Sequence, residues 1–286
     1  MPERPDLEYV VPRLDRALRD RTITDIVVKK PVVLRMMTEG GPTVLAGHRV
    51  RAVTRRLHFV CFALDRSIDM VIAPMLAGRF VLCAPSAKLS ADTACVFSLD
   101  DGSELRLRDD VQMAKVYVSP REKLGEIPGY AKVGVDVLDP RAFTKASLAK
   151  LASKRREQLK VFLMDKTLID SFGNAYADEA CWAAELHPKT RVGSLNTSQI
   201  EKLHDAIVRV LSDARDTIEK RAPPLDEKVR DFLAVRGRAG QPCPRCKTKI
   251  RSAGVHGHDS EFCPVCQPDE KATSIVDWRK IPAKTG

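Results

Sequence analysis

Two cysteine pairs near the C-terminus, CPRC at residues 243–246 and CPVC at residues 263–266, decide the fold of this part of the chain. Each pair has the C-x2-C spacing, and sixteen residues lie between the pairs. Two such knuckles can present four thiolates to one tetrahedral zinc ion. Because every ligand would be sulfur, no position remains for water or substrate, so we predict one structural zinc. The predicted ligands are Cys243, Cys246, Cys263 and Cys266; the alternative is four reduced, buried cysteines without metal.

The bulk composition describes a basic chain that can fold. It has 286 residues, 44% of them hydrophobic, and a formal net charge of +10 with a sequence pI near 9.3. The length allows two domains beside the metal module, and the hydrophobic content argues against general disorder. The positive charge favours a polyanionic partner, although lysine and arginine can also serve solubility alone.

The first part of the chain changes from a helical to a strand pattern. Apolar residues share one helical face at Leu7, Val11, Leu14 and Leu18. Pro12 falls inside this pattern and is expected to kink or shift the helix. Short β-rich runs separated by turn residues then follow as far as residue 118. Residues 1–118 are therefore predicted to form an N-terminal helix and a β-sandwich.

The remainder is predicted to be a linker followed by helices and the metal module. Residues 119–140 are rich in proline and glycine and have no sustained period. A 3.6-residue period returns over residues 141–235, and Ser198 and Glu201 form a capping-box pattern at the last long helix. The zinc β-hairpin finger is assigned to residues 236–267 and a polar tail to residues 268–286. The expected fold class is α+β.

The compartment is expected to be reducing and cytoplasmic. The chain has no run of about eighteen apolar residues and no leader-like start, so we expect neither a membrane span nor secretion. The other cysteines lie singly among apolar neighbours and are interpreted as core thiols: Cys61, Cys83, Cys95 and Cys181.

Three motifs, in order along the chain, make it similar to a known family. They are the start MPERPD at residues 1–6, the segment GNAYADE at residues 173–179 and the cysteine knuckles. Together they resemble the formamidopyrimidine-DNA glycosylase and endonuclease VIII family. The resemblance implies a helix–two-turns–helix unit and a base-excision-repair DNA glycosylase with AP-lyase activity. It also implies a nucleoid-associated monomer whose partner is double-stranded DNA carrying a damaged base or an abasic site.

The implied chemistry begins at Pro2. Removal of Met1 would expose a secondary amine with a pKa of roughly 8, which is partly unprotonated at neutral pH. Such an amine can attack C1′ of a deoxyribose, expel the base and form a Schiff base. Glu3 would transfer protons at the sugar and at the leaving group. The alternative is an ordinary N-terminal Pro-Glu pair.

Other residues match family positions less directly. Asp6 and Glu179 match two supporting acidic positions, or are helix-end charges that favour the macrodipole. Asn174 matches a phosphate-binding asparagine, or caps the end of a helix. Lys160 matches a lysine expected at phosphate, or is a solvated helix lysine.

Several expected DNA contacts depart from the family pattern. His58 stands where the family has a lysine. His258 stands where the zinc finger of the family has an arginine, and we expect it at the tip of the hairpin. Phosphate would therefore be bound less firmly. Leu76 can still act as an apolar wedge in the base stack. Gln112 and Met113 replace an arginine and an aromatic residue, so reading of the opposite base should differ.

The predicted substrate is an oxidised pyrimidine, a formamidopyrimidine, a less usual lesion or the abasic site itself. The segment over residues 221–236 is short, whereas members that read 8-oxoguanine carry a longer lesion-capping loop there. The rival hypothesis is a weakly active or non-catalytic binder of damaged or abasic DNA. Fold alone does not separate the two.

Overall fold

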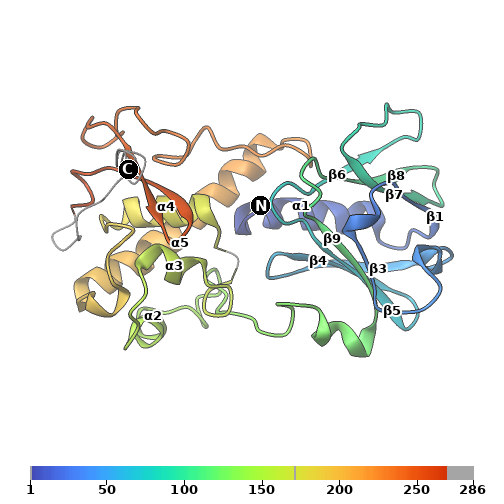
Figure 1. Cartoon of the computed structure of the whole chain (residues 1–286), viewed down its shortest axis with the longest axis horizontal. Helices are drawn as coiled ribbons and strands as arrows, with labels where there is room; N and C mark the ends of the chain where they lie inside the picture. Colours follow the sequence, from blue (N-terminus) through green and yellow to red (C-terminus); the bar gives the residue numbers. More distant parts are fainter. Residues whose placement is uncertain (1, 171, 269–286) are drawn as a thin grey trace, which may run out of the picture. The chain divides into compact units, whose positions relative to one another are not determined.

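The computed structural model describes residues 2–170 and 172–268 (Figure 1). Within these residues the chain forms two compact units. The β-sandwich unit comprises Met1–Val133 and Ala214–Val229, and the helical unit comprises Gly134–Asp213 and Arg230–Gly286. Each unit is therefore built from two separate stretches of sequence. The predicted tail lies outside the described residues from residue 269 onward.

Helix α1, Arg4–Leu18, begins the β-sandwich unit. Its apolar face is buried as the sequence period predicted, with Leu7, Leu14 and Leu18 each 1% exposed or less. Pro12 lies inside the helix, which continues past it for six more residues. The polar face of α1 also contacts the unit. The Asp15 carboxylate accepts the backbone N–H of Val53 at 2.7 Å and so joins α1 to the neighbouring sheet.

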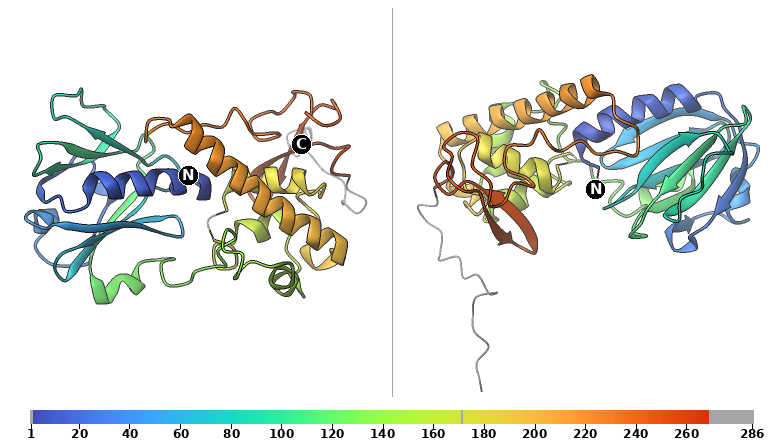
Figure 2. Two further views of the ribbon diagram at one scale, coloured as in Figure 1. Left: turned by 180° about the vertical axis from the view of Figure 1, so that it is seen from behind. Right: turned by 90° about the horizontal axis from the view of Figure 1, so that it is seen from above.

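Two sheets follow α1 (Figure 2). The strands are β1 Ile23–Val28, β2 Leu34–Met36, β3 Val50–Arg56, β4 Phe59–Leu64, β5 Ile68–Ala73, β6 Arg79–Cys83, β7 Thr93–Leu99, β8 Glu104–Arg108 and β9 Lys115–Pro120. One sheet has the order β1-β7-β8-β6 and the other β2-β9-β5-β4-β3. All neighbouring strands are antiparallel except β2 and β9, which run parallel.

The register of the five-stranded sheet follows from its buried side chains. Phe62 of β4 lies opposite Val53 of β3 and Met70 of β5, and all three are at most 3% exposed. A slip of one residue would move these side chains to the opposite face, so the buried set fixes the pairing. Short 3-10 helices are found at η1 Pro31–Val33, η2 Pro42–Leu45 and η3 Arg121–Glu126.

The helical unit contains α2 Lys145–Ala152, α3 Leu159–Met164, α4 Asn174–Ala183, η4 Val192–Ser194 and the larger part of α5 Thr197–Arg221. The capping box predicted from Ser198 and Glu201 at the start of α5 is wrong by two residues. Asn196 and Gln199 form the box instead, each side chain accepting the other's backbone N–H at 2.9 and 3.0 Å. Asparagine is as good an N-cap as serine, so the earlier polar residue begins the helix.

The second stretch of the helical unit contains a β-hairpin of β10 Arg251–Val255 and β11 His258–Phe262. His256 and Gly257 connect the strands, and both have positive φ, 49° and 81°. Two such residues form the tight turn whose twist matches that of a hairpin, and glycine adopts this conformation without strain. The α+β prediction is confirmed. Among residues 2–170 and 172–268, no helix is long and apolar enough to cross a membrane.

Candidate functional site

Pro2 and Glu3 lead directly into α1. The backbone N–H of Glu3 donates to Asp6 Oδ2 at 2.7 Å, so Asp6 caps the helix start. This is the helix-end role that the sequence left open for Asp6. All three residues are buried, with Glu3 5% and Asp6 7% exposed. The predicted chemistry requires removal of Met1, because the nitrogen of an acylated proline is an amide and not a nucleophilic amine.

A small hollow lies beside Pro2 within the β-sandwich unit. Its lining comes from Pro2, from α1 through Asp6, from the start of β6, and from residues 225–228. The volume of the hollow is about 20 Å³. Residues 223–229, which we call the closing segment, thus form one wall of the space next to the predicted nucleophile.

Leu76 stands at the tip of a tight turn before β6. Its side chain is 56% exposed, as expected for a wedge. The turn closes through Gly78 N–H, which donates to the Pro74 carbonyl at 2.8 Å. A Cβ atom at Gly78 would lie only 2.4 Å from that carbonyl oxygen, so glycine is required there. The closing segment also reaches this turn, because Lys228 Nζ donates to the Leu76 carbonyl at 3.2 Å.

The loop that carries Gln112 and Met113 is held by a buried carboxylate. Asp109 is 0% exposed and accepts the N–H groups of Val111 at 3.2 Å and Ala114 at 2.6 Å. Gln112 has φ of 55°, which belongs to a sharp turn, and Met113 is 45% exposed. Asp109 was not among the residues predicted from the sequence. The sequence feature that could have identified it is an aspartate just before a turn, where the carboxylate oxygens can accept nearby backbone N–H groups.

His58 lies in the turn between β3 and β4 and is 9% exposed. Its ring centroid lies 4.2 Å from that of Phe59, at an interplanar angle of 33°. In the same turn, Arg55 Nη1 donates to the Leu57 carbonyl at 2.8 Å. The role of His58 at phosphate stays a prediction, and little of its ring reaches the surface.

Asn174 is the first residue of α4, and Gly173 is the N-cap. The alternative interpretation of Gly-Asn as a helix C-cap is therefore wrong. Asn174 Oδ1 is buried and has no hydrogen-bond partner among the residues that the structure describes. The amide thus stands at the positive end of a helix dipole, where anions bind.

Lys160 is completely buried, so the alternative of a solvated helix lysine is wrong. Its Nζ lies 2.7 Å from Asp178 Oδ1 and donates to the Asp259 carbonyl at 2.6 Å. Burial lowers the pKa of Lys160, and Asp178 opposes that change. The ammonium therefore holds the zinc hairpin against α3 and α4, and it is enclosed by protein in this structure.

Asp178 connects four parts of the helical unit. Besides Lys160, its carboxylate accepts from the Ser260 hydroxyl at 2.6 Å, the Glu261 N–H at 3.1 Å and Arg236 Nη1 at 3.1 Å. Asp178 is 0% exposed, and every charge here has an opposite partner, as a buried network requires. Asp178 could not be predicted from the sequence, because these partners are up to 83 residues away.

Glu179 lies inside α4, so the helix-end alternative is wrong. Its carboxylate accepts the N–H groups of Ala234, Val235 and Arg236, each at 2.8 Å. Burial raises the pKa of Glu179, and these three N–H groups oppose that change. The geometry makes Glu179 an anchor for the segment that leads into the zinc finger.

The four predicted zinc ligands come together. The Sγ atoms of Cys243, Cys246, Cys263 and Cys266 all lie within 4.8 Å of one another, and none forms a disulfide. Four converging sulfurs fit a tetrahedral Zn²⁺ site, and this site binds one structural zinc. The second knuckle is tied down by buried Gln267, whose amide oxygen accepts the Cys263 N–H at 2.9 Å and whose amide nitrogen donates to Leu186.

His258 is the first residue of β11 and pairs with Val255. The expectation that His258 stands at the hairpin tip is wrong, because His256 and Gly257 form the turn. Both histidines are exposed. Asp259 follows His258, and its carbonyl accepts from Lys160 and Arg236, so the position of His258 is fixed by that network.

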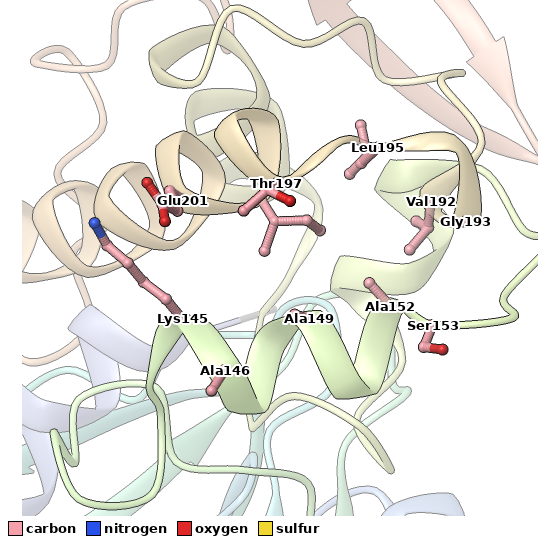
Figure 3. Close-up of a pocket in the computed structure, with 11 residues that line it drawn as sticks. Lys145, Ala146, Ala149, Ala152, Ser153, Val192, Gly193, Leu195, Thr197 and Glu201 are labelled. Carbon is pink, nitrogen blue, oxygen red and sulfur yellow. The ribbon is translucent and has the colours of Figure 1, made fainter.

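A larger pocket of about 440 Å³ lies between α2 and the start of α5 (Figure 3). Small and apolar side chains line most of it, and Lys145 and Glu201 stand at its edge (Figure 3). None of the predicted site residues lines it. Its size therefore does not mark it as the catalytic site.

Comparison with known families gives three consecutive matches. Residues 1–116 match the formamidopyrimidine-DNA glycosylase N-terminal domain, and residues 133–221 match the H2TH domain of the same glycosylase. Residues 240–268 match the zinc finger found in FPG and IleRS. The formamidopyrimidine-DNA glycosylase of Geobacillus kaustophilus is 33% identical over 276 residues, covering 93% of this chain and 100% of the relative. That of Exiguobacterium sibiricum is 34% identical over 275 residues, covering 93% and 99%.

Solved structures show the same fold. The Lactococcus lactis protein in complex with DNA containing N7-benzyl-Fapy-dG has a TM-score of 0.85 and 24% identity. The complex with DNA containing an abasic site has a TM-score of 0.84 and 23% identity. Each comparison covers 94% of this chain and 100% of the neighbour.

A helix-led β-sandwich, a helix–two-turns–helix unit and a four-cysteine zinc finger, in this order, define a class of DNA-repair glycosylases. The chain belongs to the formamidopyrimidine-DNA glycosylase family. It is a DNA glycosylase of base-excision repair, and the family resemblance seen in the sequence is confirmed.

Proposed function

We propose that the N-terminal amine of Pro2 is the nucleophile and that Glu3 transfers protons beside it. The observation that carries this proposal is the placement of Pro2 and Glu3 together at the buried start of α1. Helix α1 fixes Glu3 through the hydrogen bond to Asp6, so the carboxyl group and the amine share one rigid support. Positioning of this kind lowers the barrier by removing the need to bring reactants together.

The proposed reaction balances without a further reagent. The amine attacks C1′ and the glycosidic bond breaks, so the base leaves with a proton supplied through Glu3. The resulting iminium makes the C2′ hydrogens acidic. Loss of one of them breaks the C3′–O bond and releases the 3′ strand by β-elimination. Water then hydrolyses the iminium and frees Pro2.

Duplex DNA carrying a damaged or abasic nucleotide is the proposed partner. In the helical unit, the Nδ2–H group of the Asn174 side chain and the backbone N–H groups at the N-terminus of α4 offer a phosphate site. In the β-sandwich unit, exposed Leu76 and Met113 can fill the space left by a displaced nucleotide. His58 and His258 are proposed to add weaker contacts. The protein is proposed to act as a monomer in a reducing, cytoplasmic compartment, with residues 141–235 as its DNA-binding domain.

Borohydride trapping tests this function. Protein from which Met1 has been removed is incubated with duplexes that carry a base lesion or an abasic site, and the imine is reduced to a stable adduct. We expect an adduct that Pro2→Gly abolishes and that the matched control Pro5→Ala retains. Glu3→Gln should slow adduct formation on the base lesion by about 10²- to 10⁴-fold, the range for a general acid. Tight binding without an adduct on any duplex would favour the non-catalytic binder instead.

A further inference from the structure

Trp182 is the residue through which α4 contacts the zinc site. Cys243 and Cys263 supply two of the four sulfurs, and both are 0% exposed. The half-buried indole packs against the cluster that these cysteines form with Val235 and Ile250. A side chain of the helix is therefore part of the wall around the metal ligands.

The indole N–H of Trp182 has no ordinary acceptor. Its Nε1 atom is buried and forms no hydrogen bond with the residues that the structure describes. A buried tryptophan N–H usually finds a partner, because leaving it unpaired costs free energy. The group that it influences is Cys243: burial raises the pKa of this thiol, whereas the backbone N–H of Cys246 and the indole N–H lower it. The unpaired donor thus lies beside a metal-binding sulfur.

Arg245 holds the first cysteine knuckle against the same indole. It stands between Cys243 and Cys246 in the sequence, and its guanidinium carbon lies 4.3 Å from the centre of the Trp182 ring. Its Nη1 donates to the Trp182 carbonyl at 3.4 Å and lies 3.2 Å from Glu185 Oε1. The negative face of an indole attracts a guanidinium placed over it. Ring and knuckle are therefore fixed together at the end of α4.

A thiolate at Cys243 would supply the acceptor that this N–H lacks. Sulfur binds Zn²⁺ as a thiolate, and four thiolates leave the site with a net negative charge. Because it is ionised, a thiolate is a stronger hydrogen-bond acceptor than a thiol. Groups that donate hydrogen bonds to metal ligands orient those ligands and raise the affinity for the metal.

We propose that Trp182 is a positioning residue for the zinc site, whose indole N–H donates to the Cys243 thiolate and so ties the first knuckle to α4. The same helix begins at Asn174, the residue of the proposed phosphate site. The metal-binding sulfurs thus hold one end of the helix whose other end meets DNA. Zinc and DNA binding are coupled through α4.

Zinc competition on the full chain tests the proposal. Trp182→Phe keeps an apolar ring in the cluster but removes the N–H. We expect its affinity for Zn²⁺ to fall by about 10- to 100-fold, the range for loss of a group that supports a metal ligand. A chromogenic chelator measures the affinity. Trp278→Phe, which changes the other of the two tryptophans, is the matched control and should leave the affinity unchanged. Unchanged affinity in Trp182→Phe would overturn the proposal.

The absorption spectrum of the Co²⁺-loaded protein separates hydrogen bonding from packing. A hydrogen bond withdraws electron density from a coordinated sulfur, so loss of the donor should shift the sulfur-to-cobalt charge-transfer band to longer wavelength in Trp182→Phe. Val235→Ala removes a fully buried apolar side chain from the same cluster. That side chain carries no donor, so this variant should bind metal more weakly without a shift. An unshifted band in Trp182→Phe, or an equal shift in both variants, contradicts the N–H donor.

DNA titrations test the coupling through α4. At a zinc concentration that just saturates the unmodified protein, Trp182→Phe should bind an abasic duplex weakly, and excess zinc should restore its binding. Weak binding that excess zinc does not restore would show that Trp182 acts on DNA independently of the metal, against the proposal. Full binding at the lower zinc concentration would also speak against it. Thermal unfolding of the zinc-loaded variants identifies any loss of folding.

Discussion

Lys160 and Asp178, both fully buried, form an ion pair of 2.7 Å that joins α3 to α4 and, through the Asp259 carbonyl, to the zinc hairpin. The two ends of the pair are not equivalent. Asp178 keeps Ser260, Glu261 and Arg236 as partners if the lysine is removed, whereas Lys160 would keep only a carbonyl.

We predict that Asp178→Asn destabilises the protein more than Lys160→Met does. Asp178→Asn leaves a buried ammonium without its counter-charge and should cost about 3–5 kcal/mol, whereas Lys160→Met replaces a charge by an apolar chain of similar length. Urea unfolding of the full chain gives both values. Equal losses in the two variants would contradict the asymmetry.

The ion pair between Arg108 and Asp92 predicts an acid-dependent part of the stability. Arg108 holds the pKa of Asp92 below its ordinary value of 3.8. An acid whose pKa is lowered in the folded state stabilises that state above the unfolded pKa and loses this effect as the pH falls below it. Asp92→Asn should therefore cost about 1 kcal/mol at pH 6 and less at pH 3. Unfolding free energies of the two proteins at both pH values test this, and a constant difference would contradict it.

Zinc removal should unfold the finger without unfolding the β-sandwich unit. Apart from the four sulfurs, Val235 and Ile250 supply the fully buried apolar packing around the cysteines, which is too little to replace a metal. We expect one zinc per chain in a metal assay, and loss of DNA binding in Cys243→Ser. Circular dichroism should show the β-sheet signal retained. A stoichiometry of zero with full DNA binding would rule out the structural role.

His258→Arg should strengthen DNA binding. The exposed side chain stands at the start of β11, which the Lys160 network positions, so a guanidinium there can reach a phosphate without disturbing the fold. One added phosphate contact should steepen the slope of log K against log salt by about 1. Titrations with an abasic duplex at several salt concentrations measure this. His256→Arg at the turn is the neighbouring comparison, and equal effects would show that added charge alone is responsible.

Local features of this protein were predictable from its sequence, and long-range ones were not. The cysteine knuckles and the apolar face of α1 depend on residues a few positions apart, so spacing identified them. The start of α5 was misplaced because Asn196 and Ser198 are both good caps and only packing chooses between them. The hairpin tip was misassigned because the sequence does not show which two residues take positive φ.

The polar partners of Asp178 and Arg108 are separated from them by as many as 83 and 118 residues. Nothing in the local pattern of either residue indicates these contacts. From the sequence, the closing segment was recognised only as part of the short stretch over residues 221–236. Its attachment to α1 and β8 depends on tertiary structure.

The division of the chain limits how this protein can be dissected genetically. Residues 1–133 carry Pro2, Glu3 and both sheets, yet the closing segment lies at residues 223–229, beyond most of the other unit. A gene fragment ending near residue 133 would keep the nucleophile but lack Asp226 and its contact with Arg108. Studies of isolated domains should therefore join residues 214–229 to such a fragment, because a β-sandwich without them would lack part of its own unit and one wall of the hollow beside Pro2.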